Sequence, residues 1–330
     1  MLQSIMIKPF IKYPGGKKKI SEELRSHFPK NFNSYFEPFI GGGAIFFLVA
    51  YKEKEEFKCN NFYINDINTN ISSAYKNIRD NCTEVIDNLD IYSKEYSNYN
   101  EDGRRRYYNF RRRKFNRLIG LKTKVKDRWN DEKGISEKRY YVIKPDNSIN
   151  TKKDYGPKNT SLLIFLNKTC FNGVYRENSY GGFNVPHGKF RNIPKILNSE
   201  DLRQVSIALK DVEITNTDFS KAINKSKEGD FLYLDPPYEP ISKTSSFTMY
   251  DKSGFNKTSQ ERLKNELIKL NEKGCKFLLS NSDNGFIREL YRDEIEKKKF
   301  FLNTIKVPRM VNSKAERRGE VDEIIIKNYK

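Results

Sequence analysis

One segment, Asp235-Pro236-Pro237-Tyr238, combines a carboxylate, a rigid turn and an aromatic ring, which are residue types that could do chemistry. Two consecutive prolines cannot continue a central strand, because neither donates a hydrogen bond to the ladder. They impose a stiff turn directly after the apolar residues 231–234, at the carboxyl end of a strand, where open α/β sheets place their sites. We therefore expect the carboxylate and the aromatic ring to face a cleft. The plain alternative is a rigid turn with an incidental acid and a packed tyrosine.

A second group of residues suits the binding of a small molecule. Gly41 and Gly43 follow an apolar strand, and glycine there lets the backbone approach a ligand near a helix N-terminus. The dinucleotide fingerprint needs a third glycine where this chain has Phe46, so a cofactor without a pyrophosphate is favoured. Asp66 ends the next strand, where a carboxylate can hold a ribose diol. These features alone fit an ordinary α/β turn equally well.

Alternating strands and helices must position these residues. The expected strands are 35–40, 62–66, 212–214, 231–234, 276–280 and 323–327. One expected helix is 44–51. Another begins at a capping box, 258–261, and ends at Gly274. This alternation predicts an α/β fold with a mostly parallel sheet. Residues 81–200 lack it, so we expect them to form an inserted domain, with 1–80 and 201–330 forming the main domain.

The net charge of +19 over 330 residues favours a polyanionic partner, although a Lys- and Asn-rich composition is the plain alternative. Residues 104–128 alone hold twelve Lys or Arg against the single acid Asp127. Four scattered cysteines and two distant histidines, His27 and His187, predict reduced thiols and no metal site. The chain has no run of about 18 apolar residues, and residues 1–8 are too short and mixed for a secretory signal, so we expect a cytoplasmic protein without a membrane span.

Five motifs, spread over about residues 8–330, resemble those of the Dam-type (D12 class) DNA adenine methyltransferases and occur in that family's order. They are 10–17 for the cofactor, 37–43 for the glycine turn, 65–68 for the ribose acid, 167–176 with 182–186 for target recognition, and 235–238 for catalysis. Tyr13 stands where relatives commonly have tryptophan, and about forty residues near 118–158 are extra relative to compact members. The resemblance implies a Rossmann-like methyltransferase sheet with an inserted, mainly helical target-recognition domain.

The resemblance also implies S-adenosylmethionine as the methyl donor. The residues that it assigns to cofactor binding are Tyr13, Lys17, Asp66 and Asp235, with Gly41 and Gly43 of the glycine turn beside them. Phe39 is expected to lie against the adenine or the cationic sulfonium, and Asp218 and Phe219 are expected to line the same pocket. Asp218 could instead be an ordinary helix cap. For catalysis, Asp235 and the carbonyl of Pro236 would accept hydrogen bonds from the N6 amine, with Pro237 stiffening the turn. Tyr238 would stack on an adenine that has been flipped out of the duplex.

For recognition, the resemblance and the charge pattern point to six residues. Arg176 is expected to contact guanine through two hydrogen bonds, and the others are Asn172, Tyr175, Arg111, Arg112 and Lys168. Asn172 and Tyr175 would orient the recognition loop or wedge the duplex, and the arginine-rich run 104–117 would contact phosphates or form a solvated basic face.

The implied partner is double-stranded DNA at a short palindrome such as GATC, for a nucleoid-associated monomer or weak dimer. The implied enzyme either accompanies a separate restriction endonuclease or acts alone. Two alternatives remain open: an RNA or cytosine-N4 methyltransferase, and a catalytically silent DNA-binding module.

Overall fold

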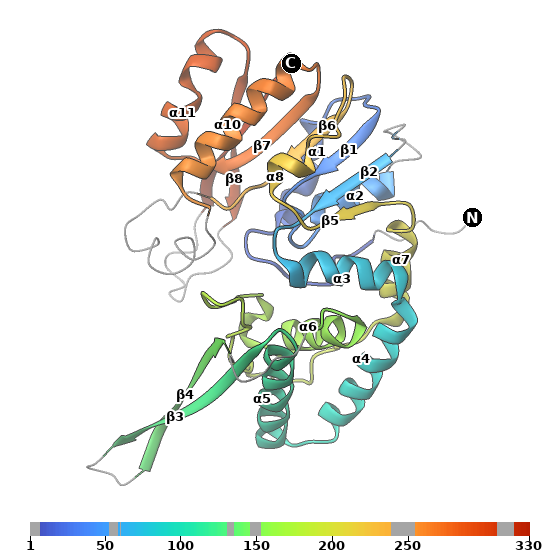
Figure 1. The fold of residues 1–330 in the computed structure, drawn as a ribbon, viewed down its shortest axis with the longest axis vertical. Coiled ribbons are helices and arrows are strands. Elements are labelled where there is room, and N and C mark those ends of the chain that lie inside the picture. Colours follow the sequence, from blue (N-terminus) through green and yellow to red (C-terminus); the bar gives the residue numbers. More distant parts are fainter. Residues whose placement is uncertain are drawn as a thin grey trace. The chain divides into compact units, whose positions relative to one another are not determined.

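The computed structural model describes residues 7–52, 59, 61–130, 135–145, 153–238, 255–308 and 320–330. These residues form two compact units (Figure 1). The first contains Gly16–Asn68 and Asp211–Lys330, and the second contains Lys8–Gly15 and Thr69–Lys210. Within this described part of the chain, every helix is too short or too polar to cross a bilayer.

The first unit is built on one sheet, in the order β5-β2-β1-β6-β7-β9-β8 among the described strands. The strands are β1 Ser34–Glu37, β2 Asn61–Asn65, β5 Glu213–Thr215, β6 Phe231–Leu234, β7 Lys276–Ser282, β8 Phe301–Pro308 and β9 Glu320–Lys327. The helices are η1 Lys17–Lys19, α1 Ser21–Ser26, α2 Ala44–Lys52, α8 Phe219–Ala222, α10 Lys257–Glu272 and α11 Gly285–Glu296. The neighbouring strands β5, β2, β1, β6 and β7 run parallel to one another, and β9 is antiparallel to both of its neighbours. This arrangement confirms the expected mostly parallel α/β fold.

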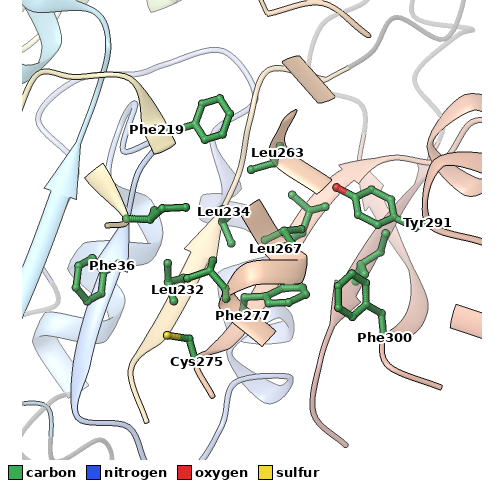
Figure 2. Close-up of a cluster of buried hydrophobic side chains, with 14 of the residues drawn as sticks. Phe36, Phe219, Leu232, Leu234, Leu263, Leu267, Cys275, Phe277, Tyr291 and Phe300 are labelled. Carbon is green, nitrogen blue, oxygen red and sulfur yellow. The ribbon is translucent and has the colours of Figure 1, made fainter. Parts of the chain in front are cut away.

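The core of this unit forms around its central strands, since β6 is wholly apolar and β1 places Tyr35 and Phe36 between Ser34 and Glu37. All four residues of β1 and of β6 are buried, as parallel strands covered on both faces require. Leu263, Leu267 and Leu270 form the inner face of α10, and Figure 2 shows the first two beside side chains of β6 and β7. Each such leucine contributes about 1.5–3 kcal/mol by burial, so this helix is fixed against the strand that leads into Asp235.

The C-terminal end of α10 lies where the sequence predicted it, whereas the N-terminal cap differs from the prediction. Gly274 ends the helix as expected, with φ +78° and its N–H donating to the Asn271 carbonyl at 3.1 Å. The N-terminal cap is Asn256, whose side chain accepts from the Ser259 N–H at 3.0 Å. The capping box expected at 258–261 is therefore wrong, because Asn256 is the N-cap and Thr258 already lies in the first turn of the helix.

The order of the strands brings the two motif-bearing turns together. From β1 the chain proceeds to β2 on one side, whereas β6 pairs with β1 on the other, with Tyr35 opposite Phe231. The carboxyl ends of β1 and β6 therefore border the point where strand order reverses, which is where open α/β sheets bind ligands. The glycine turn and the Asp235 turn both leave the sheet at this edge.

The second unit is mainly helical and carries a two-stranded ribbon. Its elements are α3 Thr69–Asp80, α4 Cys82–Ser97, α5 Glu101–Leu118, β3 Leu121–Asn130, β4 Ile135–Pro145, α6 Pro157–Thr169, η2 Phe171–Gly173 and α7 Ser199–Ala208. It is larger than the insert expected at 81–200, because α3 and α7 pack with the helices of this unit. The antiparallel ribbon β3–β4 lies in the extra segment near 118–158.

Candidate active site

Asp235 and Lys17, 218 residues apart in sequence, form an ion pair at the carboxyl end of β6. The Lys17 Nζ lies 2.8 Å from each of the two carboxylate oxygens of Asp235. Lys17 is only 4% exposed and stands in the short helix η1. Such a cation fixes the orientation of the carboxylate. The structure thus brings together two of the residues that the sequence assigned to the site.

Tyr238, at the end of the same motif, is also held in place. Its hydroxyl donates to Glu323 Oε2 at 2.7 Å, and the Lys17 Nζ lies 4.7 Å from the centroid of its ring. Lys17 is also 4.0 Å from Glu323. Sequence reasoning missed Glu323; the one available signal was a charged residue directly before the buried run 324–326 of a strand.

Several carboxyl groups gather around this ion pair. Burial raises the pKa of Asp235, and the Lys17 charge opposes that shift. Burial also raises the pKa of Glu323, and the neighbouring charge of Asp235 adds to the increase. Glu37, at the end of β1, accepts from the Tyr35 hydroxyl at 2.6 Å, and burial raises its pKa well above the usual value. Three carboxyl groups that are close together and shielded from water favour the binding of a positively charged group in addition to Lys17.

The glycine turn is tied to the Asp66 carboxylate. The N–H of Gly41 donates to one carboxylate oxygen at 3.0 Å, and the N–H of Asn68 donates to the other at 2.9 Å. Gly41 and Gly43 have φ of +45° and +71°, which other residues rarely adopt. Burial raises the pKa of Asp66 to about 6, against the effect of these two backbone donors. A buried carboxylate beside a turn of glycine residues, which have no side chains to block a ligand, can accept hydrogen bonds from a polyol.

Three aromatic rings form a cluster that includes Phe39, two residues before the glycine turn. Phe39 lies 5.5 Å from Phe219 and 5.6 Å from Phe255 between ring centroids, and Phe219 lies 5.8 Å from Phe255. Two of these rings were expected in the site, whereas Phe255 was missed because it belongs to no motif. Flat apolar surfaces of this kind suit an adenine ring.

Asp218 has other partners. It caps α8, accepting from the Ser220 N–H at 3.0 Å, and forms an ion pair with Arg262 at 2.8 Å. The Arg262 guanidinium also lies 5.0 Å from the ring of Phe219. The geometry matches the helix-cap alternative for Asp218, and a contact with the cofactor stays a prediction.

In the second unit, Arg176 and Asn184 bracket a tight hairpin, called here the recognition hairpin (176–184). The Asn184 N–H donates to the Arg176 carbonyl at 3.2 Å, and Arg176 Nε donates to Asn184 Oδ1 at 2.9 Å. Asn178 closes the turn, accepting from the N–H groups of Tyr180 and Gly182 at 3.1 and 2.9 Å. Arg176 is exposed at the base of this hairpin, where its terminal nitrogens could bind a partner.

The neighbouring expected residues differ in exposure. Tyr175 is 2% exposed and stacks on Tyr13, with 5.6 Å between ring centroids. This burial fits a role in orienting the loop better than one in wedging a duplex. Tyr13 itself belongs to the second unit. Asn172 is exposed with a left-handed φ of +59°, and Lys168 is partly buried.

Two arginines of α5 do not lie where we expected them. Arg111 is 7% exposed, ion-paired with Glu95 at 2.5 Å, and Arg112 is 3% exposed, donating to the Val185 carbonyl at 2.8 Å. Both guanidinium groups hold this unit together, so the structure does not support the phosphate contacts expected of them. The exposed arginines of the helix are Arg105, Arg106, Arg113 and Arg117.

Known proteins are similar to this chain in sequence. The family model of the D12 class N6 adenine-specific DNA methyltransferases matches residues 13–303. The Type II methyltransferase M.MjaIII of Methanocaldococcus jannaschii is 35% identical, covering 98% of this chain and 99% of the relative. The Type II methyltransferase M1.LlaDCHI of Lactococcus lactis subsp. cremoris is 32% identical, over 98% and 96%, and the DNA adenine methylase of Haemophilus influenzae is 26% identical, over 96% and 92%. The chain therefore belongs to the D12 class of N6 adenine-specific DNA methyltransferases.

Proposed function

We propose that this protein transfers a methyl group from S-adenosylmethionine to N6 of an adenine flipped out of duplex DNA, within a short palindrome such as GATC. The first unit carries the chemistry and the second reads the DNA. The observation that carries the proposal is the Asp235 carboxylate, held by Lys17 at the same sheet edge as the glycine turn and Asp66.

The residues at this edge fit S-adenosylmethionine. Asp66 can accept hydrogen bonds from the ribose hydroxyls, and Phe39 and Phe219 offer apolar rings for the adenine. The surplus of carboxyl groups around Asp235 favours a cationic ligand. The bound cofactor supplies an electrophilic methyl group on a positively charged sulfur. The family resemblance adds Tyr13 to the cofactor residues.

The chain's own groups make the target amine reactive. The lone pair of adenine N6 is delocalised into the ring, and hydrogen bonds to Asp235 and to the Pro236 carbonyl draw the nitrogen toward tetrahedral geometry. Lys17 acts as a positioning residue, because it fixes both oxygens of that carboxylate. Glu323 is a second positioning residue: it anchors the Tyr238 hydroxyl, so that the ring is pre-oriented to stack on the flipped base.

The second unit reads the target. Arg176, supported by the recognition hairpin, is proposed to form two hydrogen bonds with a guanine edge. Asn172, which is exposed, is proposed to orient the recognition loop or to wedge the duplex. The exposed arginines of α5 would contact phosphates, which position the duplex without specifying sequence.

The setting is also proposed from the relatives. Two of them are named Type II methyltransferases, so we propose that this enzyme protects DNA against a separate restriction endonuclease in the same cytoplasm. Digestion of host DNA with restriction enzymes before and after expression would reveal which sites become protected.

One experiment tests the reaction. The purified protein is incubated with labelled S-adenosylmethionine and duplexes of varied sequence, and the DNA is then digested to nucleosides. We expect N6-methyladenine, confined to one short motif when the DNA is sequenced by a single-molecule method. N4-methylcytosine, or a preference for RNA, would contradict the proposal. Binding of DNA without any transfer would identify a silent module instead.

A further inference from the structure

The turn that carries Asp235 is bound by a side chain near the start of α10. Because prolines have no N–H, residues 236 and 237 cannot hold the turn with backbone donors of their own. Gln260 of α10 donates its Nε2–H to the Pro237 carbonyl at 3.1 Å. Gln260 is only 1% exposed, so water does not compete for this hydrogen bond. The turn is thereby attached to a helix whose leucine face is fixed against the sheet.

A second buried amide binds the first. Asn281 of β7 is fully buried, and its Nδ2–H donates to Gln260 Oε1 at 3.1 Å. Its own Oδ1 accepts from the backbone N–H of Ser282 at 2.9 Å. Leu234, the last residue of β6, lies opposite Leu279 of β7. Strand β7 therefore continues past the end of β6, and this continuation carries Asn281 to the level of the turn.

These hydrogen bonds form one directed chain, called here the amide relay (Ser282 N–H, Asn281, Gln260, Pro237 carbonyl). A backbone N–H can only donate, and a carbonyl oxygen can only accept. The Ser282 N–H therefore requires the oxygen of the Asn281 amide, which directs the Asn281 NH2 group toward Gln260. Gln260 must then present its oxygen to Asn281 and its NH2 group to the carbonyl. Neither amide can reverse without breaking a buried hydrogen bond, which is costly, so the relay has one stable orientation.

We propose that Gln260 and Asn281 are positioning residues for methyl transfer, which act through the turn that carries Asp235. Neither side chain has to touch cofactor or DNA for this role. The two prolines stiffen the turn and the relay orients it, so the acceptors for the target amine are in place before the base arrives. The proposal rests on the proposed function in one respect, namely that this turn receives the target adenine.

Two parts of the turn depend on the relay. The Pro237 carbonyl and the Tyr238 N–H belong to one planar peptide group, so the relay sets the direction of the Tyr238 backbone. Glu323 holds the hydroxyl at the other end of that side chain, at 2.7 Å. The Pro236 carbonyl, which is proposed to accept from the amine, belongs to the peptide group directly before. Loss of the relay should therefore disturb both the stacking ring and one acceptor.

Two substitutions interrupt the relay, and a third serves as a matched control. Gln260→Leu keeps a side chain of similar size and removes both of its hydrogen bonds. Asn281→Ala removes the amide at the far end of the relay. The control is Asn328→Ala. Asn328 donates to the side chain of Asn271 of α10 at 2.9 Å and accepts from the Phe277 N–H at 2.9 Å. This similar amide pair lies at the amino end of β7, away from the turn.

Methyl transfer is measured in a single turnover at saturating cofactor and DNA, and duplex affinity is measured by anisotropy. We expect Gln260→Leu and Asn281→Ala to slow transfer about 10- to 100-fold, with little change in duplex affinity. The double variant should be no slower than Gln260→Leu alone, because Asn281 acts through Gln260. Asn328→Ala should lower the melting temperature and leave the transfer rate at that of the parent.

The variant Gln260→Glu gives a pH signature that a merely structural role would not produce. A carboxyl group at this position can donate to the Pro237 carbonyl only while it is protonated. Burial raises the pKa of such a carboxyl group. The transfer rate of this variant should therefore approach that of the parent at low pH and fall as the pH rises through the raised pKa. The parent, which has an amide at this position, should show no such fall.

Thermal melting first establishes that each variant is folded. If Asn281→Ala or Gln260→Leu is unfolded, the pH profile of Gln260→Glu decides the question, since this substitution preserves the shape of the side chain. Parent-like transfer in the folded relay variants would overturn the proposal. A pH profile of Gln260→Glu that follows the parent would overturn it too, as would an equal slowing of transfer in Asn328→Ala.

Amide hydrogen exchange at Tyr238 separates this proposal from the proposed function, because it requires no activity. The Tyr238 N–H should exchange faster in Gln260→Leu and Asn281→Ala than in the parent and in Asn328→Ala. A parent that makes N6-methyladenine, with relay variants that transfer and exchange as it does, would refute the relay and leave the methylation intact. Faster exchange in the relay variants of a protein that methylates nothing would support the hold on the turn and refute the reaction.

Discussion

The carboxyl edge of the sheet in the first unit and helix α5 in the second both bury charged side chains, and they use them differently. At the sheet edge, Lys17 and Asp235 are paired where two parallel strands end and their chains diverge. On α5, Arg111 and Arg112 are buried among helices and bind Glu95 and a backbone carbonyl.

The difference teaches that a buried charge indicates chemistry only where the architecture leaves an opening beside it. Ends of parallel strands at a reversal of strand order provide that opening. The side of a packed helix does not, so a buried arginine there satisfies hydrogen-bond acceptors of its own unit. The exposed arginines of α5 are the ones suited to DNA.

The largest expected effect concerns the sheet edge. Asp235→Ala removes the acceptor for the target amine, and methyl transfer should fall about 10²- to 10⁴-fold. DNA affinity should change little, because this carboxylate contributes nothing to phosphate binding. Single-turnover kinetics and anisotropy measure the two quantities separately. An equal loss of both would undo the catalytic role assigned to Asp235.

The next effect tests the other half of the comparison. Arg112→Ala leaves the Val185 carbonyl without this donor, and should lower the free energy of unfolding by about 3 kcal/mol. Arg113→Ala, at the exposed neighbouring position, should change stability by less than about 0.5 kcal/mol. It should instead reduce the salt slope of DNA binding by about 1. Urea denaturation measures the two stabilities. A similar loss of stability in both variants would contradict the distinction between the buried and the exposed arginine.

Arg176 should affect specificity more than stability. Arg176→Ala is expected to cost about 1–3 kcal/mol of discrimination at one base pair of the target. Methylation rates on duplexes substituted at each position would locate that pair. A uniform loss over all sequences would make Arg176 a phosphate contact.

The pH dependence of transfer tests the ion pair. Asp235 accepts hydrogen bonds from the amine as a carboxylate, so the rate falls as the pH drops through its pKa. Burial raises that pKa, which places the fall at higher pH than for an exposed aspartate. Lys17→Gln removes the cation that lowers the pKa, so the fall should move to still higher pH, whereas Lys18→Gln, at an exposed neighbour, should leave the profile unchanged. Identical profiles in both variants would refute the role of Lys17.

The smallest expected effect is that of Tyr238→Phe. The variant keeps the ring and loses the hydrogen bond to Glu323, which is worth about 1 kcal/mol. Transfer should slow by less than about tenfold, and Glu323→Gln, which keeps an acceptor oxygen, should slow it no more. A hundredfold loss in Tyr238→Phe would mean that the hydroxyl takes part in the reaction.

Much of the fold of the first unit was predictable from local sequence. Apolar runs bounded by turn residues identified β6 and β7, because parallel strands must be buried on both faces. Strand β8 was not expected, since it mixes polar and apolar residues at the sheet edge. The start of α10 was misplaced because Thr258 and Asn256 are both good caps, and backbone geometry chose between them.

The sequence by itself determined the stiff Asp235 turn, the glycine turn and the family, because prolines and glycines act through their own backbone angles. Only the tertiary structure decided which charges are buried and with what partner. Lys17 pairs with Asp235, which is 218 residues away in sequence. Glu323 lies near them because the antiparallel last strand begins at the carboxyl edge of the parallel strands, with Glu323 opposite Ser282. Such pairings depend on the order of strands in the sheet, which no local pattern encodes. Burial likewise separated Arg112 from Arg113, two neighbours that a sequence cannot tell apart.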